Sequence, residues 1–197
     1  MDLRDEDGAP ERWVFGYGSL MWRPGFQHVE RRRATLDGLH RAFCIYSVHH
    51  RGTYARPGLV LGLAAGGSVR GAAYRVDEAA WPQVYAYLVE REQPTETYVE
   101  ARVRVRLDDE REVEALSFLS DQGHPQWAGE LDVERQAELI AGATGLSGRN
   151  VDYLRDLVER LRDDGEPDPG MEALLLRVQA MQVAGWTPSR SPSPAAP

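Results

Sequence analysis

Cysteine is almost absent from this chain of 197 residues, because Cys44 is the only one. A lone cysteine forms no intrachain disulfide, cannot build a structural zinc site and is typical of a reducing compartment. Cys44 lies within the apolar run of residues 42–46, which favours an inert core thiol over a reactive nucleophile. The cysteine content therefore predicts a cytoplasmic protein that does not depend on thiolate chemistry.

Long apolar runs and positive charge are also scarce. No run of about 18 apolar residues occurs, and the acidic N-terminus lacks the apolar core of a signal peptide, so we expect no membrane-spanning segment. The chain has 31 acidic and 23 basic residues, which give a formal net charge of −8. This charge argues against nucleic acid and anionic membrane surfaces as partners. The basic run at 31–33 has no flanking aromatic platform and is interpreted as an exposed turn or strand end.

Motifs for metal, cofactor and serine chemistry are missing as well. The five histidines are not spaced as metal ligands, and there is no Gly-x-Ser-x-Gly elbow. Gly16 and Gly18 lack the third glycine of a dinucleotide fingerprint and the Gly-Lys-Ser/Thr ending of a P-loop. We therefore expect a protein that works without a metal ion, a thiolate or a serine triad.

Strand patterns fill the first 120 residues. Apolar and polar side chains alternate in residues 99–107 and 113–119, and a period of two is typical of antiparallel strands with one buried face. Further strand candidates are the apolar runs at 13–15, 41–47, 58–64 and 69–76.

Helical patterns follow, mainly in the last third of the chain. One helix is predicted at 78–92, and later helices are expected to begin at Asp132, Ser147 and Asp168-Pro169, which suit the start of a helix. Strands followed by helices predict the α+β class, with helices gathered on one side of an antiparallel sheet or small barrel.

The same patterns predict the domain organisation. No internal repeat or interdomain linker interrupts residues 12–184, so we expect a single domain there. The acidic start at 1–11 and the Ser/Pro/Ala-rich end at 187–197 are predicted to be flexible.

Helical spacing at 78–92 singles out one carboxylate. At 100° per residue, Glu92 continues the apolar stripe that carries Leu88, whereas Glu90 lies on the opposite face. Burial and the helix C-terminus would both raise the pKa of Glu92 toward the range that suits proton transfer at neutral pH. The alternative is a frayed last turn, in which Glu92 is exposed or paired with an arginine of the strand at 99–107.

The second candidate feature is the turn after the first strand. Its residues are Phe15, Gly16, Tyr17, Gly18, Ser19 and Leu20. Two glycines one residue apart let the main chain bend tightly and bring its N–H groups against a ligand, and Ser19 adds a hydroxyl group. The same pattern occurs in ordinary hairpins, so a purely structural turn is the alternative.

Several ordered segments extend these two features. They are residues 13–26, 50–53, 57–63, 71–76, 87–92 and 145–150, followed by Tyr153-Leu154. Together they resemble the ChaC-type γ-glutamylcyclotransferases over about residues 12–180. The chain departs from that family in its polar stretch at 93–97 and in its Ser/Pro tail.

The resemblance implies a γ-glutamylcyclotransferase-like fold, in which a small mixed or antiparallel β-barrel is flanked by helices. It also implies the cleavage of glutathione, a small-molecule substrate, to 5-oxoproline and cysteinylglycine without a cofactor. By position, it implies that Glu92 is the catalytic acid/base and that residues 15–20 form the substrate-binding loop. It leaves the oligomeric state open.

The chemistry of such a reaction suits the residues present. The α-amino group of a γ-glutamyl peptide can attack its own γ-carbonyl, so the enzyme need not supply a nucleophile. One glutamate of raised pKa can take a proton from the ammonium and return it to the departing amine. The loop at 16–20 is suited to bind either the α-carboxylate of the substrate or the oxyanion at its γ-carbonyl.

Two further side chains are candidates for substrate binding. Tyr98, which follows Glu92 by six residues, could point its hydroxyl into the same pocket or pack as a strand residue at the mouth of the barrel. Arg51 could bind a carboxylate of the substrate or be an ordinary surface arginine.

Two other functions compete with glutathione cleavage. One is cyclotransferase activity on other γ-glutamyl amines or amino acids. The other is a non-catalytic regulator of cation transport, which would not need a carboxylate at position 92.

Overall fold

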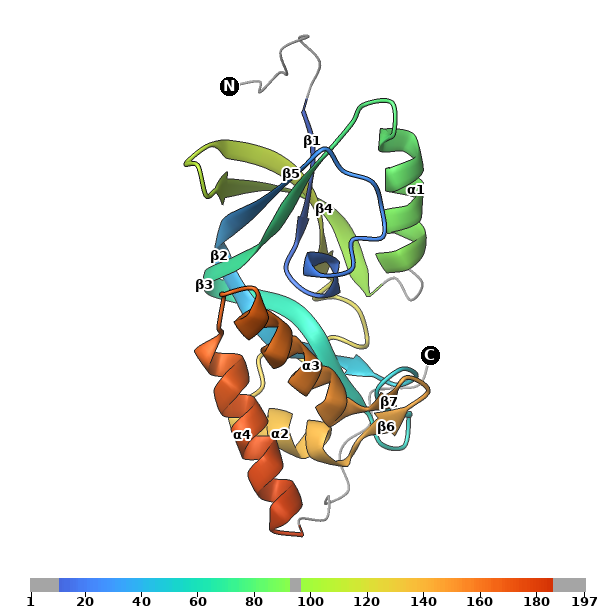
Figure 1. Ribbon diagram of the computed structural model, residues 1–197. Coiled ribbons are helices and arrows are strands. Elements are labelled where there is room, and N and C mark those ends of the chain that lie inside the picture. Colours follow the sequence, from blue (N-terminus) through green and yellow to red (C-terminus); the bar gives the residue numbers. More distant parts are fainter. Residues whose placement is uncertain (1–10, 93–96, 186–197) are drawn as a thin grey trace. The chain divides into compact units, whose positions relative to one another are not determined.

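The computed structural model describes residues 11–92 and 97–185 (Figure 1). The strands of the larger sheet are β1 (Arg12–Gly16), β2 (Glu30–Ser47), β3 (Gly58–Val76), β4 (Tyr98–Leu107) and β5 (Glu112–Ser120). The helices are the 3-10 turn η1 (Ser19–Met21), α1 (Trp81–Glu92), α2 (Val133–Gly142), α3 (Asn150–Asp163) and α4 (Pro169–Val183). A two-stranded hairpin is formed by β6 (Thr144–Gly145) and β7 (Gly148–Arg149).

The chain divides into two compact units. The first comprises the residues up to Arg41 and Ala65–Asp121, and the second comprises Ala42–Ala64 and the residues from Gln122 onward. Because β2 and β3 each run from one unit into the other, this division does not test the prediction of one domain at 12–184. The predicted flexible termini lie outside the described residues except for Glu11.

The five long strands close into a barrel in the order β1-β3-β2-β4-β5. β1 pairs antiparallel with β3, from Arg12 opposite Val76 to Gly16 opposite Ala72, and parallel with β5. β4 pairs antiparallel with both β2 and β5. The combination of a parallel pair with antiparallel pairs confirms the predicted α+β class with a mixed barrel flanked by helices.

The strands are longer than the sequence pattern predicted. The run at 41–47 is the end of β2, and the separate strands predicted at 58–64 and 69–76 form the single strand β3. Gly66 and Gly67, which lie between the two predicted runs, have positive φ angles of 92° and 69° but remain inside β3.

Both faces of β5 are buried over residues 115–118, which the predicted alternation did not anticipate. Ala115 and Ser117 are buried on one face, and Leu116 and Phe118 are buried on the other. In β4 the alternation is confirmed at its far end, because Val105 is buried between exposed arginines. Since successive side chains of a strand point to opposite faces, β5 must be covered from two sides.

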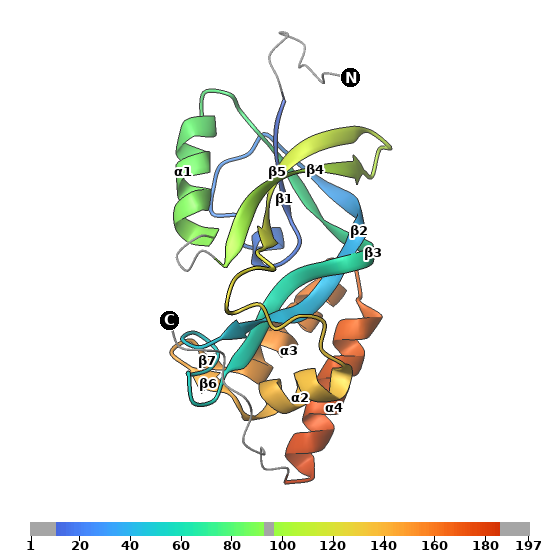
Figure 2. The same cartoon turned by 180° about the vertical axis from the view of Figure 1, so that it is seen from behind.

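Helix α1 provides the second cover, and it lies along the barrel in both views (Figure 1 and Figure 2). Its buried residues Val84 and Leu88 pack with Leu116 and Phe118 of β5 in one apolar cluster. The helix was predicted at 78–92 but begins at Trp81. Residues 78–80 form a turn in which the carboxylate of Asp77 accepts a hydrogen bond from the N–H of Ala79 (2.9 Å).

In the second unit, α2, α3 and α4 pack against one another. Asp132 caps α2 by accepting a hydrogen bond from the N–H of Arg135 (2.7 Å), and Asp168 caps α4, where Pro169 occupies the first turn. Both starts agree with the sequence prediction. Among the described residues, no helix is long and apolar enough to cross a membrane.

The predicted cap at Ser147 is wrong. The N–H of Ser147 donates to the carbonyl of His50 (2.9 Å) within the β6–β7 hairpin, and α3 begins only at Asn150. The side chain of Asn150 is buried and binds both main-chain groups of Leu59, accepting from its N–H (2.6 Å) and donating to its carbonyl (2.7 Å). The start of α3 is therefore fixed by a bond to β3 rather than by a serine cap.

Truncation of Leu88 tests the packing of α1. Leu88 is 0% exposed, so Leu88→Ala should lower the free energy of unfolding by about 2–5 kcal/mol through lost burial and a cavity. Leu176→Ala is the matched control, because Leu176 is 67% exposed, and it should change the same quantity by less than about 0.5 kcal/mol. Urea unfolding of the three proteins measures both values, and equal losses would contradict the packing described.

Candidate active site

Glu92 is the last residue of α1, and its side chain is 19% exposed. It follows the buried Leu88 by one helical turn, whereas Glu90 is exposed. Within the part of the chain that the structure describes, Glu92 pairs with its neighbour Arg91, whose Nε lies 3.0 Å from Oε1. Of the two arrangements open from the sequence, the structure has the inward one.

Burial raises the pKa of Glu92 above its ordinary value of 4.5. The charge of Arg91 and its hydrogen bond act in the opposite direction and are outweighed. The carboxylate therefore holds its proton more tightly than an exposed glutamate would, which is the direction expected of a group that exchanges protons near neutral pH.

The turn after β1 is compact because its first glycine lies against its last residue. A Cβ atom at Gly16 would be 2.5 Å from the Cβ of Leu20, so a larger residue could not be accommodated without moving the turn. The turn continues into η1, where the N–H of Met21 donates to the carbonyl of Gly18 (2.9 Å) and that of Arg23 to the carbonyl of Ser19 (2.9 Å). The first N–H groups of such a helical turn have no partner within it.

The side chains of this loop divide into buried anchors and one exposed group. Phe15 is 0% exposed, Tyr17 8% and Leu20 7%, whereas Ser19 is exposed. The hydroxyl of Tyr17 donates to the carbonyl of Phe118 in β5 (2.8 Å). Any ligand of the loop would therefore meet its main chain and the hydroxyl of Ser19 rather than its aromatic rings.

A buried arginine supports the loop from the barrel. Arg41 is 6% exposed, and its Nε donates to the carbonyl of Tyr17 (2.8 Å). Its Nη2 lies 3.3 Å from the sulfur of Met21 and also donates to the carbonyl of Arg70. Sequence reasoning missed Arg41, because nothing in the strand pattern of β2 distinguishes a buried arginine from an exposed one.

Arg91 connects the loop with Glu92, and sequence reasoning missed it as well. Its Nη2 donates to the hydroxyl of Ser19 (3.0 Å), while its Nε bonds Glu92. Its Nη1 donates to the hydroxyl of Tyr87 (2.9 Å), one turn earlier in α1. The available signal was this spacing of four residues between Tyr87 and Arg91, which brings two side chains together on a helix surface.

Tyr98 opens β4, opposite Ser120 of β5. It is partly buried and packs against the apolar cluster that includes Leu88 and Phe118. The structure therefore brings Tyr98 to the same cluster that holds the last turns of α1, as a strand residue.

Arg51 belongs to the second unit. Its Nη1 donates to the carbonyl of Arg149 (3.3 Å), and its guanidinium carbon lies 5.2 Å from the ring centre of Tyr153. These contacts attach Arg51 to the β6–β7 hairpin and α3, and its predicted role in substrate binding stays a prediction.

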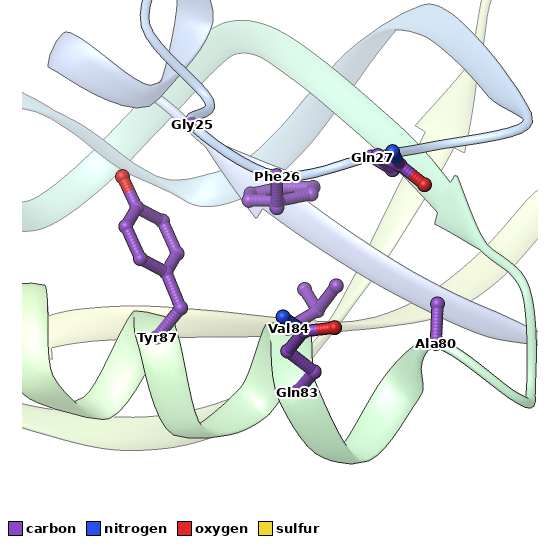
Figure 3. A pocket seen from close by; sticks show the side chains of 7 residues that line it. All are labelled: Gly25, Phe26, Gln27, Ala80, Gln83, Val84 and Tyr87. Carbon is purple, nitrogen blue, oxygen red and sulfur yellow. The ribbon is translucent and has the colours of Figure 1, made fainter.

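A cavity of about 270 Å³ lies between α1 and the segment that precedes β2 (Figure 3). It is lined by Gly25, Phe26, Gln27, Ala80, Gln83, Val84 and Tyr87. Figure 3 shows the hydroxyl of Tyr87 pointing toward Gly25 while Phe26 lies over Val84. None of the predicted site residues lines this cavity, but its lining residue Tyr87 binds Arg91, and its lining residue Val84 packs in the same apolar cluster as Leu20.

Metal ligands are not gathered at the site. Over residues 11–92 and 97–185, no group of three His, Cys, Asp or Glu side chains is arranged to hold a metal ion.

Comparison with known proteins gives consistent matches over most of the chain. The model of a family described as ChaC-like protein matches residues 12–181. The glutathione-specific gamma-glutamylcyclotransferase of Escherichia coli (strain K12) is 40% identical over 169 residues, which are 86% of this chain and 73% of that protein. The human glutathione-specific gamma-glutamylcyclotransferase 1 is 32% identical over 158 residues, which are 78% of this chain and 71% of that protein.

The fold also has a solved counterpart. The crystal structure of a gamma-glutamyl cyclotransferase specific to glutathione from yeast superposes with a TM-score of 0.77 at 24% identity, covering 87% of this chain and 99% of that chain. At this identity the likeness concerns the fold, and it confirms the predicted γ-glutamylcyclotransferase-like architecture.

Gly25 offers a test of the link between the loop and α1. It has a φ of 76°, and a Cβ at this position would lie 1.9 Å from the hydroxyl of Tyr87. Gly25→Ala should therefore cost about 1–2 kcal/mol for the left-handed backbone and a further amount for displacing Tyr87. Gly38→Ala is the matched control, since Gly38 has a φ of 87° and nothing within 4 Å of its Cβ position. Urea unfolding should show the larger loss for Gly25→Ala, and equal losses would mean that Tyr87 is not held in place.

Proposed function

The chain belongs to the ChaC-like protein family, and on that premise we propose that it cleaves the γ-glutamyl group of glutathione by intramolecular cyclisation, giving 5-oxoproline and cysteinylglycine. The names of its Escherichia coli and human relatives support glutathione as the substrate. The observation that carries the proposal in this chain is the largely buried Glu92, bound through one guanidinium to the loop of Ser19.

The reaction needs no nucleophile from the protein. The α-amino nitrogen of the γ-glutamyl group attacks its own γ-carbonyl carbon, and the amide bond to cysteine breaks. The nitrogen enters as an ammonium group and ends as a lactam N–H, so two protons leave it. Both are taken up by the departing nitrogen, which leaves cysteinylglycine with an ammonium group, and no water is consumed. The protein must fold the substrate for attack and move these protons, and such orientation alone can contribute several kcal/mol.

Glu92 is the residue we propose for the proton transfers. Its carboxylate would take a proton from the ammonium group before ring closure and deliver one to the departing nitrogen afterwards. A raised pKa suits both steps, and burial of Glu92 produces that rise. A fully exposed glutamate would be a weaker base and would hold its proton too loosely for the second step.

The loop from Phe15 to Leu20 is the proposed binding element. Its aromatic side chains are buried, so the substrate would be held by main-chain N–H groups at Gly18 and Ser19 and by the hydroxyl of Ser19. Such groups suit an α-carboxylate or the oxyanion that forms at the γ-carbonyl. The bond from Arg41 to the carbonyl of Tyr17 (2.8 Å) would keep the loop in its binding conformation.

Tyr98 and Arg51 are proposed as further substrate contacts. Tyr98 shares the apolar cluster that packs around Leu88 of α1, so its position is compatible with a hydroxyl near the pocket. Arg51 carries a charge suited to a substrate carboxylate. We also propose that the protein acts in the cytoplasm, which its single buried cysteine, Cys44, favours.

Replacement of Glu92 tests the proposed reaction. With reduced glutathione, the wild type should release 5-oxoproline and cysteinylglycine in equal amounts, and Glu92→Gln should lose about 10²–10⁴-fold in kcat because the proton carrier is gone. Glu90→Gln, on the exposed face of the same helix turn, is the matched control and should retain wild-type turnover. Mass spectrometry of the products measures all three proteins.

Other results would point to other functions. Release of glutamate instead of 5-oxoproline would mean hydrolysis and would contradict the mechanism. Turnover of γ-glutamyl-alanine or γ-glutamyl-lysine but not of glutathione would favour a cyclotransferase for other γ-glutamyl compounds. A wild type that is inert on all of them would favour the non-catalytic regulator.

The raised pKa of Glu92 predicts opposite pH dependences of activity and stability. As the base must be ionised, kcat/KM should fall as the pH drops through the pKa of Glu92, which lies above 4.5. Because the folded protein binds this proton more tightly than the unfolded chain does, protonation of Glu92 stabilises the fold. This contribution is complete below the pKa that Glu92 has in the unfolded chain, and it is lost as the pH rises through the pKa that Glu92 has in the folded protein. Urea unfolding of wild type and Glu92→Gln across pH should show this difference, and parallel curves would refute the raised pKa.

A further inference from the structure

The guanidinium of Arg91 makes more polar contacts than an ordinary surface arginine. It donates through Nε to Glu92, through Nη2 to the hydroxyl of Ser19 (3.0 Å), and through Nη1 to the hydroxyl of Tyr87 (2.9 Å). Nη1 also donates to the carbonyls of Arg23 and Pro24, the latter at 3.1 Å. The acceptors come from α1, from η1 and from the segment that follows η1.

These contacts involve all three nitrogens of the planar guanidinium group. The guanidinium presents its N–H donors in a fixed fork, so atoms bound to different nitrogens are held at set positions relative to one another. The carboxylate of Glu92 and the hydroxyl of Ser19 are bound to the same fork. Movement of the loop away from α1 would therefore break the bond to Ser19 and those to the carbonyls of Arg23 and Pro24.

We infer that Arg91 is the positioning residue of the proposed cyclisation: it holds Oε1 of Glu92 and the hydroxyl of Ser19 in one network while the carboxyl group of Glu92 exchanges the proton. The inference rests on the proposed function and assigns a role to a residue that does not itself exchange protons. Arg91 acts through Glu92 and through the loop.

The charge of Arg91 also affects the pKa of Glu92. Of the other ionisable side chains around α1, Tyr87 binds Arg91 through its hydroxyl (2.9 Å), Tyr98 packs against the cluster that contains Leu88, and Glu100 accepts a hydrogen bond from Tyr85 (2.6 Å), about two turns before Glu92. Among the described residues, the charge that changes the pKa of Glu92 is that of Arg91, and it lowers this pKa against the larger effect of burial. Without Arg91, burial would act alone and the pKa of Glu92 would rise further.

Two substitutions separate the charge of Arg91 from its shape. Arg91→Gln removes the charge, so the pKa of Glu92 should rise by about one unit or more, and the acidic limb of the kcat/KM profile should move with it. Arg91→Lys keeps a charge near Glu92 but cannot reach all the acceptors of the fork. It should leave the acidic limb within about half a unit of wild type and lower kcat/KM at least about tenfold, mainly through a higher KM, because the loop is released.

The pKa of Glu92 can be measured without turnover. A pH titration of ¹³C-labelled glutamate side chains by NMR gives it directly, and the signal of Glu92 is identified by its loss in Glu92→Gln. Arg104→Gln is the matched control, because Arg104 is exposed in β4, and it should change neither the titration nor kcat/KM. Thermal unfolding followed by circular dichroism establishes that each variant is folded.

The results distinguish this inference from the proposed function. An unchanged pKa of Glu92 in folded Arg91→Gln would overturn the electrostatic role of Arg91 even if the wild type cleaves glutathione. Unchanged kcat/KM in Arg91→Lys would overturn its role in holding the loop, and this test stands if Arg91→Gln does not fold. A wild type that is inert on glutathione would overturn the proposed function, whatever the titration gives.

Discussion

Burial of one face of α1 against β5 is the interaction on which the site depends. The side chains of Leu116 and Phe118 point away from the face that carries Ala115 and would meet water if α1 did not cover them. Packing of Val84 and Leu88 on them fixes the rotation of the helix about its axis. That rotation decides that Glu92 turns inward, that Glu90 turns outward, and that Arg91 lies at the border, where it reaches the loop.

Two arginines bind the loop at different positions. Arg41 binds the carbonyl of Tyr17, and Arg91 binds the hydroxyl of Ser19. Close main-chain approach makes this possible, since a Cβ at Gly71 would lie 2.4 Å from the carbonyl oxygen of Gly16. With the carbonyl of Tyr17 and the hydroxyl of Ser19 held by the protein, the main-chain N–H groups at Gly18 and Ser19 are the groups that we propose for recognition of an anionic part of the substrate.

Local sequence patterns correctly predicted those features that depend on residues close together in the sequence. The inward direction of Glu92 followed from helical spacing, and the caps at Asp132 and Asp168 followed from their side chains. The cap at Ser147 failed because its N–H is bound to the carbonyl of His50, a residue almost a hundred positions earlier in the chain. Arg41 and Arg91 were missed for the same reason, because their roles consist of contacts with segments that are distant in sequence. An arginine in a strand or at a helix edge has the same local pattern whether it binds a loop or faces solvent.

The choice of arginine at position 91 has a chemical consequence for a site that moves protons. All 23 basic residues of this chain are arginines, and a guanidinium keeps its proton at any pH at which a protein is folded. When Glu92 is protonated, the ion pair with Arg91 is lost, but the N–H donors to Ser19 and to the carbonyls of Arg23 and Pro24 remain. A lysine beside a buried carboxylate could give up its own proton, so that the network and the acid would titrate together. With arginine, the charge of the pair is set by Glu92 alone, and the loop keeps its support through both proton transfers.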